Sequence, residues 1–325
     1  MGCSASVQTT PKDSSSKYGP MQGKLNINKI NAAIDDIVKA CKGAGTDEQV
    51  LINITANCNS YERDAIVDAY MQKYNKSLSD LLKSELSGNL DKLFVGMYTN
   101  RKIYWAEQIN EAVKGAGTDE KKLIDLVVSL GTEFIDVDRL YNQMYKNCIH
   151  ETIVSECGNA PYSKLLQQWL TASKSHNETP EKTAEDLFKA ADGAGTNEDV
   201  FIKIMTTMYP QHYQKVDAEF NKRYQKSLRS VIKAEFSGKS EYAFLAVHDY
   251  LMAPPRFIAN MLYTAVKGLG TNDDQIIYCT VLHADVFAKH VASAYSHMGL
   301  GDLKKDIKGD LSGKYEKAVL AFWKL

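Results

Sequence analysis

The sequence has no long apolar run, either inside the chain or near its N-terminus. A membrane-spanning helix needs roughly 18 or more apolar residues in succession, and a secretory leader needs an apolar N-terminal segment, so we expect neither. Proline is scarce, at 7 of 325 residues, while 44% of the residues are hydrophobic. A chain of this composition is expected to bury a large core and to be globular.

Cysteine pairs and an excess of charge are also missing. The 6 cysteines show no CxxC spacing and no disulfide framework, so we expect a reduced, intracellular setting. The 39 basic and 40 acidic residues give a net charge of -1. This balance provides no general attraction to nucleic acid, which we do not expect as a partner, and binding to an anionic surface would need a local source of positive charge.

What the sequence does contain is a short motif that occurs four times. Gly-x-Gly-Thr, followed by Asp or Asn and then an acid, begins at Gly43, Gly115, Gly193 and Gly268. The intervals between copies are 72, 78 and 75 residues. A motif that returns at such a spacing is the mark of a repeat protein. We therefore expect four copies of one unit.

The repeats set the expected domain boundaries. Residues 1–23 form a polar head, and the polar segment 172–182, which holds one proline, indicates a linker. The four repeats are expected at residues 24–98, 99–171, 183–253 and 254–325.

The periodicity inside a repeat is helical. In the first repeat Ile27, Ile30, Ile34 and Ile37 recur at intervals of three and four, which is typical of the buried side of an amphipathic helix. Alternation of apolar and polar residues is missing. The sequence predicts an all-α fold with almost no sheet and about five short helices in each of four homologous repeats.

Each turn places glycines at alternate positions, which permits backbone conformations that other residues disfavour. Such a turn can direct several carbonyl oxygens at one point, and converging oxygens suit Ca²⁺, which takes six to eight oxygen ligands. An acid follows the first glycine by 42 residues in three repeats, as Glu85, Glu235 and Asp310. The spacing favours a cation site made by the turn and the distant acid.

Two other interpretations of the turn are weaker. A single copy is well explained by helix capping, since glycine ends one helix and Thr-Asp-Glu starts the next. Four copies with a paired acid favour the cation site. A phosphate-binding loop is disfavoured because the Gly-Lys-Ser/Thr ending is missing and the turn follows a helix.

On these turns and acids the sequence resembles the annexin family, over about 300 of its 325 residues. The resemblance implies a curved disc of four five-helix repeats that binds acidic phospholipid membranes with Ca²⁺ as cofactor. It implies that each main site combines three turn carbonyls with one carboxylate. The main sites would be Cys41, Gly43 and Gly45 with Glu85; Val113, Gly115 and Gly117 with Glu156; Ala191, Gly193 and Gly195 with Glu235; and Val266, Gly268 and Gly270 with Asp310.

The resemblance also implies a weaker neighbouring site beside each main site. It uses the carbonyl of the turn threonine and the acid two residues later. The neighbouring sites would be Thr46 with Glu48, Thr118 with Glu120, Thr196 with Glu198, and Thr271 with Asp273.

The chain departs from the family pattern in two respects. In the second repeat the position 42 residues after Gly115 is Cys157, so a one-residue deletion is needed to make Glu156 the ligand. Annexins also commonly carry an arginine 12 residues after the turn threonine. The residues found there are Cys58, Leu130, Met208 and His283. These departures put an internal hydrogen-bond arrangement in doubt and indicate a divergent lineage, such as that of the protist alpha-giardins.

The N-terminus carries a separate membrane signal. Met-Gly-Cys-Ser-Ala-Ser matches the pattern for myristoylation of Gly2, with Cys3 beside it as a palmitoylation candidate. One myristoyl chain attaches only weakly, so stable anchoring would need palmitate or the Ca²⁺ sites. The alternative is a chance match on a disordered polar tail.

Together these features predict a protein that is not an enzyme and is monomeric in solution. We expect it to be peripheral on the cytoplasmic face of a membrane, with the plasma membrane as the favoured one. The seven histidines show no recurring arrangement with Ser or Cys that would serve catalysis. An alternative function is a cytoskeleton-associated scaffold of the giardin kind, in which lipid binding is secondary.

Overall fold

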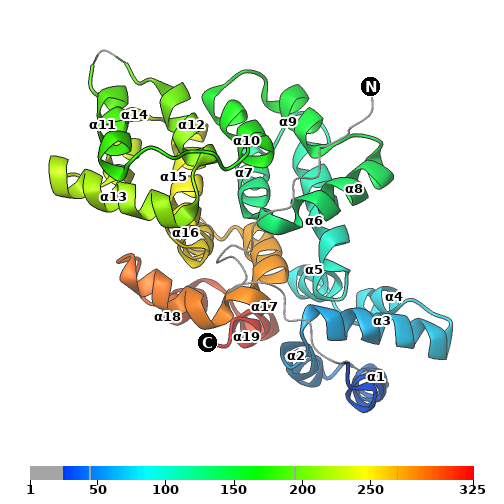
Figure 1. The fold of residues 1–325 in the computed structure, drawn as a ribbon. Helices are drawn as coiled ribbons and strands as arrows, with labels where there is room; N and C mark the ends of the chain where they lie inside the picture. The colour runs from blue at the N-terminus through cyan, green and yellow to red at the C-terminus, as the bar shows by residue number, and fades with distance from the viewer. Residues whose placement is uncertain (1–24, 44, 194, 269) are drawn as a thin grey trace. The chain divides into compact units, whose positions relative to one another are not determined.

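The computed structural model describes residues 25–43, 45–193, 195–268 and 270–325. Within these ranges the chain forms nineteen α-helices and no strand (Figure 1). The expectation of an all-α fold is confirmed. The head at residues 1–23, with Gly2 and Cys3, lies outside the described residues.

The helices form two compact units. Unit 1 runs to Tyr104 and resumes at Ile258–Leu325, and unit 2 is Trp105–Phe257. Unit 1 therefore combines the first and fourth repeats, and unit 2 combines the second and third. Two helices carry the chain from one unit into the other: α6 (Arg101–Val113) and α16 (Pro254–Val266).

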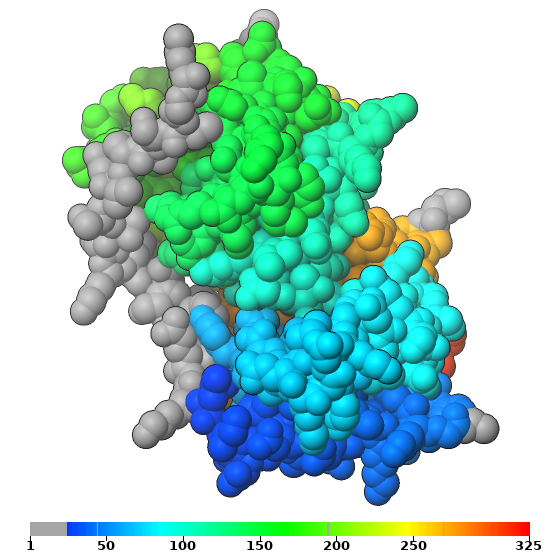
Figure 2. All heavy atoms as spheres, turned by 90° about the vertical axis from the view of Figure 1, so that its right-hand side faces the viewer, coloured from blue at the N-terminus to red at the C-terminus, as the bar shows by residue number. Residues whose placement is uncertain are grey.

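The first repeat, in unit 1, has the expected five helices. They are α1 (Ile27–Ala40), α2 (Glu48–Ala56), α3 (Ser60–Tyr74), α4 (Leu78–Glu85) and α5 (Gly88–Met97). Figure 2 shows this repeat, in blue to cyan, covering the side of unit 1 that faces the viewer.

The fourth repeat departs from the five-helix plan. After α16 it contains α17 (Asp273–His297), α18 (Leu303–Asp310) and α19 (Gly313–Phe322). The 25-residue helix α17 stands where the other repeats have two helices. The reason is local: the first repeat breaks at Asn57 to Asn59, and the third at Pro210, whereas residues 282–285 of the fourth hold no proline, and the one capping residue type among them, Asp285, pairs with Arg63. In unit 1, α19 packs against α2, and α17 packs against α5.

Unit 2 contains the second and third repeats. After α6 come α7 (Glu120–Ser129), the 3-10 helix η2 (Gly131–Glu133), α8 (Phe134–Tyr145), α9 (Ile149–Cys157), α10 (Pro161–Thr171), α11 (Pro180–Ala191), α12 (Glu198–Thr207), α13 (Pro210–Tyr224), α14 (Leu228–Glu235) and α15 (Gly238–Met252). Here α15 packs against α7, and α10 packs against α12. The connection before α11 ends at Thr179, earlier than the expected 182, because Pro180 is the first residue of α11 and Thr179 caps it.

A buried guanidinium joins the two repeats of unit 1. Arg63 is 2% exposed, and its Nε donates to the Met97 carbonyl at 2.7 Å. Its Nη1 donates to the Cys58 carbonyl at 2.5 Å, and Nη2 donates to Asp285 Oδ2 at 2.7 Å. A buried charge is tolerated when its donors are satisfied in this way. The four residues that replace the expected family arginine are themselves buried: Cys58, Leu130, Met208 and His283.

A buried histidine in unit 2 predicts a pH dependence of stability. His248 is 2% exposed, and its Nδ1 lies 2.9 Å from the Tyr213 hydroxyl. Burial lowers the pKa of His248 to about 4. The folded pKa is thus below the unfolded pKa of about 6.5, so the unfolded chain binds a proton that the native chain does not. The stability linked to this group is complete above pH 6.5 and is lost as the pH falls towards 4.

We expect this histidine to reduce the free energy of unfolding of unit 2 by about 3 kcal/mol between pH 6.5 and 4. The measurement is denaturant unfolding across that range. The variant H248N should lower the slope of the unfolding free energy against pH by about one proton. An H248N slope equal to that of the parent would contradict the assignment.

Candidate metal centres

The four turns close with one recurring backbone hydrogen bond. In each, the residue after the threonine donates its N–H to the carbonyl of an alanine near the end of the preceding helix. The pairs are Asp47 to Ala40 at 2.9 Å, Asp119 to Ala112 at 2.7 Å, Asn197 to Ala190 at 2.8 Å and Asn272 to Ala265 at 2.9 Å. The side chain of the same residue caps the next helix by accepting from the N–H three residues later, as Asp47 does from Val50 at 3.1 Å. The capping prediction is confirmed, and it coexists with the proposed metal site.

The glycines of the turns are required by backbone conformation. Gly43 and Gly45 have φ of 113° and 107°, and a Cβ added at either would meet nothing within 4 Å. Space is therefore not the constraint, whereas these φ values disfavour every other residue. The second and third turns repeat the pattern. The fourth differs, because Gly270 has φ of 82° but Gly268 lies outside the left-handed region.

The distant acid meets the turn in three repeats. The hydroxyl of Thr46 donates to Glu85 Oε2 at 2.6 Å, and that of Thr196 donates to Glu235 Oε2 at 2.7 Å. In the second repeat the hydroxyl of Thr118 donates to Glu156 Oε2 at 2.9 Å. In the first and third repeats the acid is the last residue of α4 or α14, and the threonine precedes α2 or α12. In the second repeat the acid lies in the last turn of α9, and the threonine precedes α7. The structure thus brings the acid of the first and third repeats to the turn with which the spacing paired it, through a threonine hydroxyl that the spacing did not single out.

In the second repeat the structure places Glu156, and not Cys157, at the turn. Cys157 is 8% exposed, and burial raises the pKa of its thiol, so it remains protonated. Glu156 is exposed and bonded to Thr118. This arrangement agrees with the one-residue deletion inferred from the sequence.

The thiol of Cys41 is not available as a thiolate ligand. Burial, followed by the negative charge of Glu85, raises its pKa to about 11. The thiol therefore keeps its proton at neutral pH, and only the Cys41 carbonyl can serve a metal ion. The influence of Glu85 on Cys41 is a second sign that the acid lies against the turn.

In the fourth repeat one oxygen of the acid is left without a hydrogen-bond donor among the described residues. Asp310 Oδ2 is buried and has no hydrogen-bond partner in the part of the chain that the structure describes. Burial, followed by the charge of Asp273, a hydrogen bond with that carboxylate and then the charges of Asp274 and Asp310, raises the pKa of Tyr315. An unpartnered buried carboxylate oxygen is costly, and a bound cation would satisfy it. The residues of this turn therefore fit a divalent cation.

The acids of the neighbouring sites fall into two groups. Glu48 pairs with Lys314 Nζ at 3.3 Å, and Glu120 pairs with Lys239 Nζ. Glu198 and Asp273 have no ion pair among the described residues. All four acids lie within the first two residues of the helix after the turn, beside the threonine that the sequence assigned to the same site.

Side chains alone do not make up the expected centres. Over the described ranges there is no group of three or more His, Cys, Asp or Glu side chains that could hold a metal ion. The expected sites draw most of their oxygens from carbonyls. No helix among the described residues is long and apolar enough to cross a membrane.

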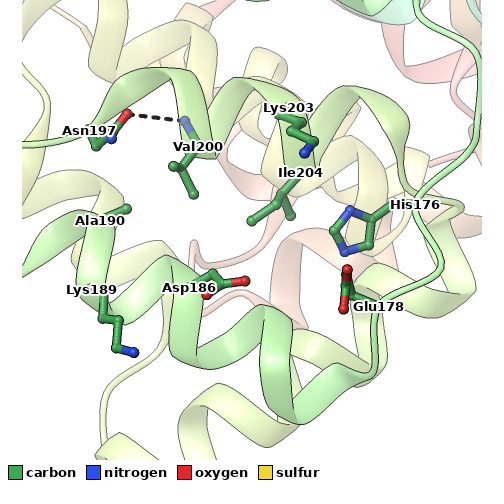
Figure 3. Close-up of a pocket in the computed structure, with 9 residues that line it drawn as sticks. All are labelled: His176, Glu178, Asp186, Lys189, Ala190, Asn197, Val200, Lys203 and Ile204. Atoms are coloured by element: carbon green, nitrogen blue, oxygen red, sulfur yellow. Dashed lines mark hydrogen bonds between the residues drawn. The ribbon is translucent and has the colours of Figure 1, made fainter.

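A hollow of about 340 Å³ lies beside the third turn (Figure 3). His176 and Glu178 come close together at one end of it, and Asn197 of the turn lines the other. Its lining residues include no serine or cysteine nucleophile, and His176 Nε2 is held by the Thr183 hydroxyl at 2.9 Å. Burial, followed by the neighbouring His212, lowers the pKa of His176. The hollow therefore does not hold the groups that nucleophilic catalysis needs.

Comparison with known proteins agrees with the geometry of the turns. The family model described as Annexin matches residues 34–97, 182–247 and 257–322, so the divergent second repeat lies outside the matched ranges. The chain is 34% identical over 292 residues to Annexin A7 of Dictyostelium discoideum, covering 87% of this chain and 62% of that protein, which is less than two thirds of its length. It is 32% identical over 311 residues to Annexin A4 of Mus musculus, covering 94% and 97% of the two chains.

Solved structures show the same similarity. Calcium-bound alpha-14 giardin superposes with a TM-score of 0.84 at 25% identity, covering 90% of this chain and 99% of that chain. Chicken annexin V in complex with Zn²⁺ gives a TM-score of 0.82 at 30% identity, covering 90% and 94%. The two comparisons place both annexins and an alpha-giardin among the structural neighbours.

The geometry of the second turn predicts which of two adjacent residues holds a metal ion there. We expect E156Q to reduce Ca²⁺ uptake by about one ion per chain, because an amide lacks the charge of the ligand. The variant C157S should bind as the parent does. Calorimetric titration of both variants tests this, and loss of binding in C157S alone would show that the second site is wrongly assigned.

Proposed function

The chain belongs to the annexin family, and on that premise we propose that it binds acidic phospholipid membranes through Ca²⁺ ions held by its four turns. Annexin homology implies calcium-dependent phospholipid binding, and the family is non-enzymatic, in agreement with the sequence expectation. We also propose that the turn carbonyls and the paired acids are the ligands, that the bound Ca²⁺ bridges them to a lipid phosphate, and that the head is acylated.

The observation that carries the assignment is the hydrogen bond between turn and acid. A threonine hydroxyl of the turn lies 2.6 to 2.9 Å from a carboxylate oxygen 38 or 39 residues away in three repeats. The contact ties Glu85, Glu156 and Glu235 to the threonines of the turns, and this supports the proposal that each acts with the carbonyls of the same turn. The unpartnered Asp310 Oδ2 supports the fourth main site.

The ligand count of each main site favours a bridging role. Three carbonyls and one carboxylate supply fewer oxygens than the six to eight that Ca²⁺ takes, so coordination is left for a lipid phosphate oxygen. When bound, Ca²⁺ supplies the positive charge that a chain of net charge -1 lacks for holding an anionic surface. The described residues of each turn are largely exposed, so a lipid headgroup can reach the turn. Attachment of this kind is peripheral, on the cytoplasmic face of the membrane.

A cytoskeletal scaffold remains the alternative function, and no contact among the described residues favours it. Sedimentation in the presence of Ca²⁺, with acidic vesicles in one sample and cytoskeletal filaments in another, distinguishes the membrane-binding function from the scaffold function. Actin filaments or microtubules should fail to carry the chain into the pellet under Ca²⁺ concentrations at which acidic vesicles succeed.

The main sites predict the effect of removing their carboxylates. We expect the triple variant E85Q, E235Q and D310N to need at least about tenfold more Ca²⁺ for half-maximal sedimentation with phosphatidylserine vesicles, because each amide loses a charged ligand. The matched control is D35N, E185Q and E219Q, which changes the charge equally at exposed ion pairs outside the turns. Equal sedimentation of the site variant and the control would refute the ligand assignment.

Acylation of the head predicts a membrane-bound fraction that does not depend on Ca²⁺. When the chain is produced with an N-myristoyltransferase and a protein S-palmitoyltransferase, we expect part of it to remain with membranes in excess chelator, and G2A to be released fully. The variant C3S should be released more than the parent but less than G2A, because one acyl chain anchors weakly. Intact-mass analysis reports the modification directly, and an unmodified Gly2 would exclude it.

A further inference from the structure

At two of the neighbouring sites the carboxylate forms an ion pair with a lysine. Lys239 follows the glycine that begins α15, and its Nζ contacts Glu120 Oε1, at the start of α7. Lys314 follows the glycine that begins α19, and its Nζ lies 3.3 Å from Glu48 Oε2, at the start of α2. Each pair joins two repeats of the same unit. The two contacts are equivalent, since α15 packs on α7 as α19 packs on α2.

At the other two neighbouring sites no lysine pairs with the acid itself, although Lys164 Nζ of α10 lies 3.8 Å from Asp199, the residue after Glu198. In all four repeats a glycine with positive φ precedes the position of Lys239 and Lys314 or its equivalent. The φ angles are 65° at Gly88, 60° at Gly158, 56° at Gly238 and 66° at Gly313. The residue that follows is Lys239 or Lys314 in the third and fourth repeats but Asn89 or Asn159 in the first and second. Their helices, α5 and α10, pack on α17 and α12, which begin with Asp273 and Glu198. Neither acid has an ion pair among the described residues.

We infer that Lys239 and Lys314 are built-in competitors of Ca²⁺, so that the neighbouring sites of the first and second repeats fill at higher Ca²⁺ than those of the third and fourth. The inference rests on the proposed function, because it concerns the same turns. A carboxylate oxygen that accepts from an ammonium group cannot give its full charge to a cation, and the ammonium charge repels that cation.

The competition is weak enough to be reversible. The Lys239 side chain is 55% exposed and that of Glu120 is 21% exposed, while Lys314 and Glu48 are 40% and 33% exposed. Ion pairs that water reaches are weak and are screened by salt. High Ca²⁺ can therefore displace each lysine, and the displacement breaks one contact between two repeats. Main sites are not affected, because Glu85 and Glu156 pair with threonines instead.

The test removes the lysines and measures Ca²⁺ binding without lipid. Calorimetric titration of K239Q with K314Q should show the neighbouring sites of the first two repeats filling at about two- to fivefold lower Ca²⁺ than in the parent. The matched control is K29Q with K182Q, which loses the same charge from ion pairs at the starts of α1 and α11. Identical isotherms for the lysine variant and the control would overturn the inference.

A second variant tests the idea without removing a native contact. N89K with N159K introduces the lysine at the equivalent positions of the first two repeats and should raise, by a similar factor, the Ca²⁺ needed at Asp273 and Glu198. An unchanged isotherm here also counts against the inference. Failure of the proposed function looks different, because then the parent binds no Ca²⁺ and the triple variant of the main-site acids changes nothing.

Discussion

A hydrogen bond from a turn threonine to a carboxylate far along the chain is the contact on which each of the first three proposed main sites depends. Glycine-bearing turns alone can present carbonyl oxygens, but they carry no charge. The threonine hydroxyl fixes the end of α4, α14 or α9 against the start of the helix after the turn. Since the carboxylate is oriented before any ion arrives, little side-chain freedom is lost on binding. The repeat folds so as to prepare the site.

Much of this arrangement could be predicted from the sequence, because it is local or periodic. Helical spacing gave the elements, and the fixed interval between turn and acid gave the pairing of Glu85 with the first turn. The fused helix α17 was not expected, although the missing proline near His283 was a usable signal. The sequence predicts a metal-binding role for the backbone carbonyl of Thr46 only. It does not predict that the Thr46 hydroxyl donates a hydrogen bond that positions Glu85.

Contacts between repeats could not be predicted in the same way. Pairing of the first repeat with the fourth is set by side chains that meet only in the folded chain, such as Arg63 and Asp285. Spacing within one repeat carries no information about such a partner. The lysines that contact Glu48 and Glu120 were likewise invisible, because each comes from another repeat. Departure from the family arginine at Cys58 indicated a lost hydrogen-bond arrangement, yet Arg63 donates to the Cys58 carbonyl itself.

The composition of unit 1 has a consequence for how the chain is made. Its two repeats are encoded on either side of unit 2, so during synthesis the ribosome releases all of Trp105–Phe257 before α17 and α19 emerge. Unit 2 can complete its core while the first repeat still lacks its packing partner. Contacts of such high sequence separation form late and slowly. The nascent first repeat therefore exposes apolar helix surface longest, and is the segment where a chaperone would be needed most.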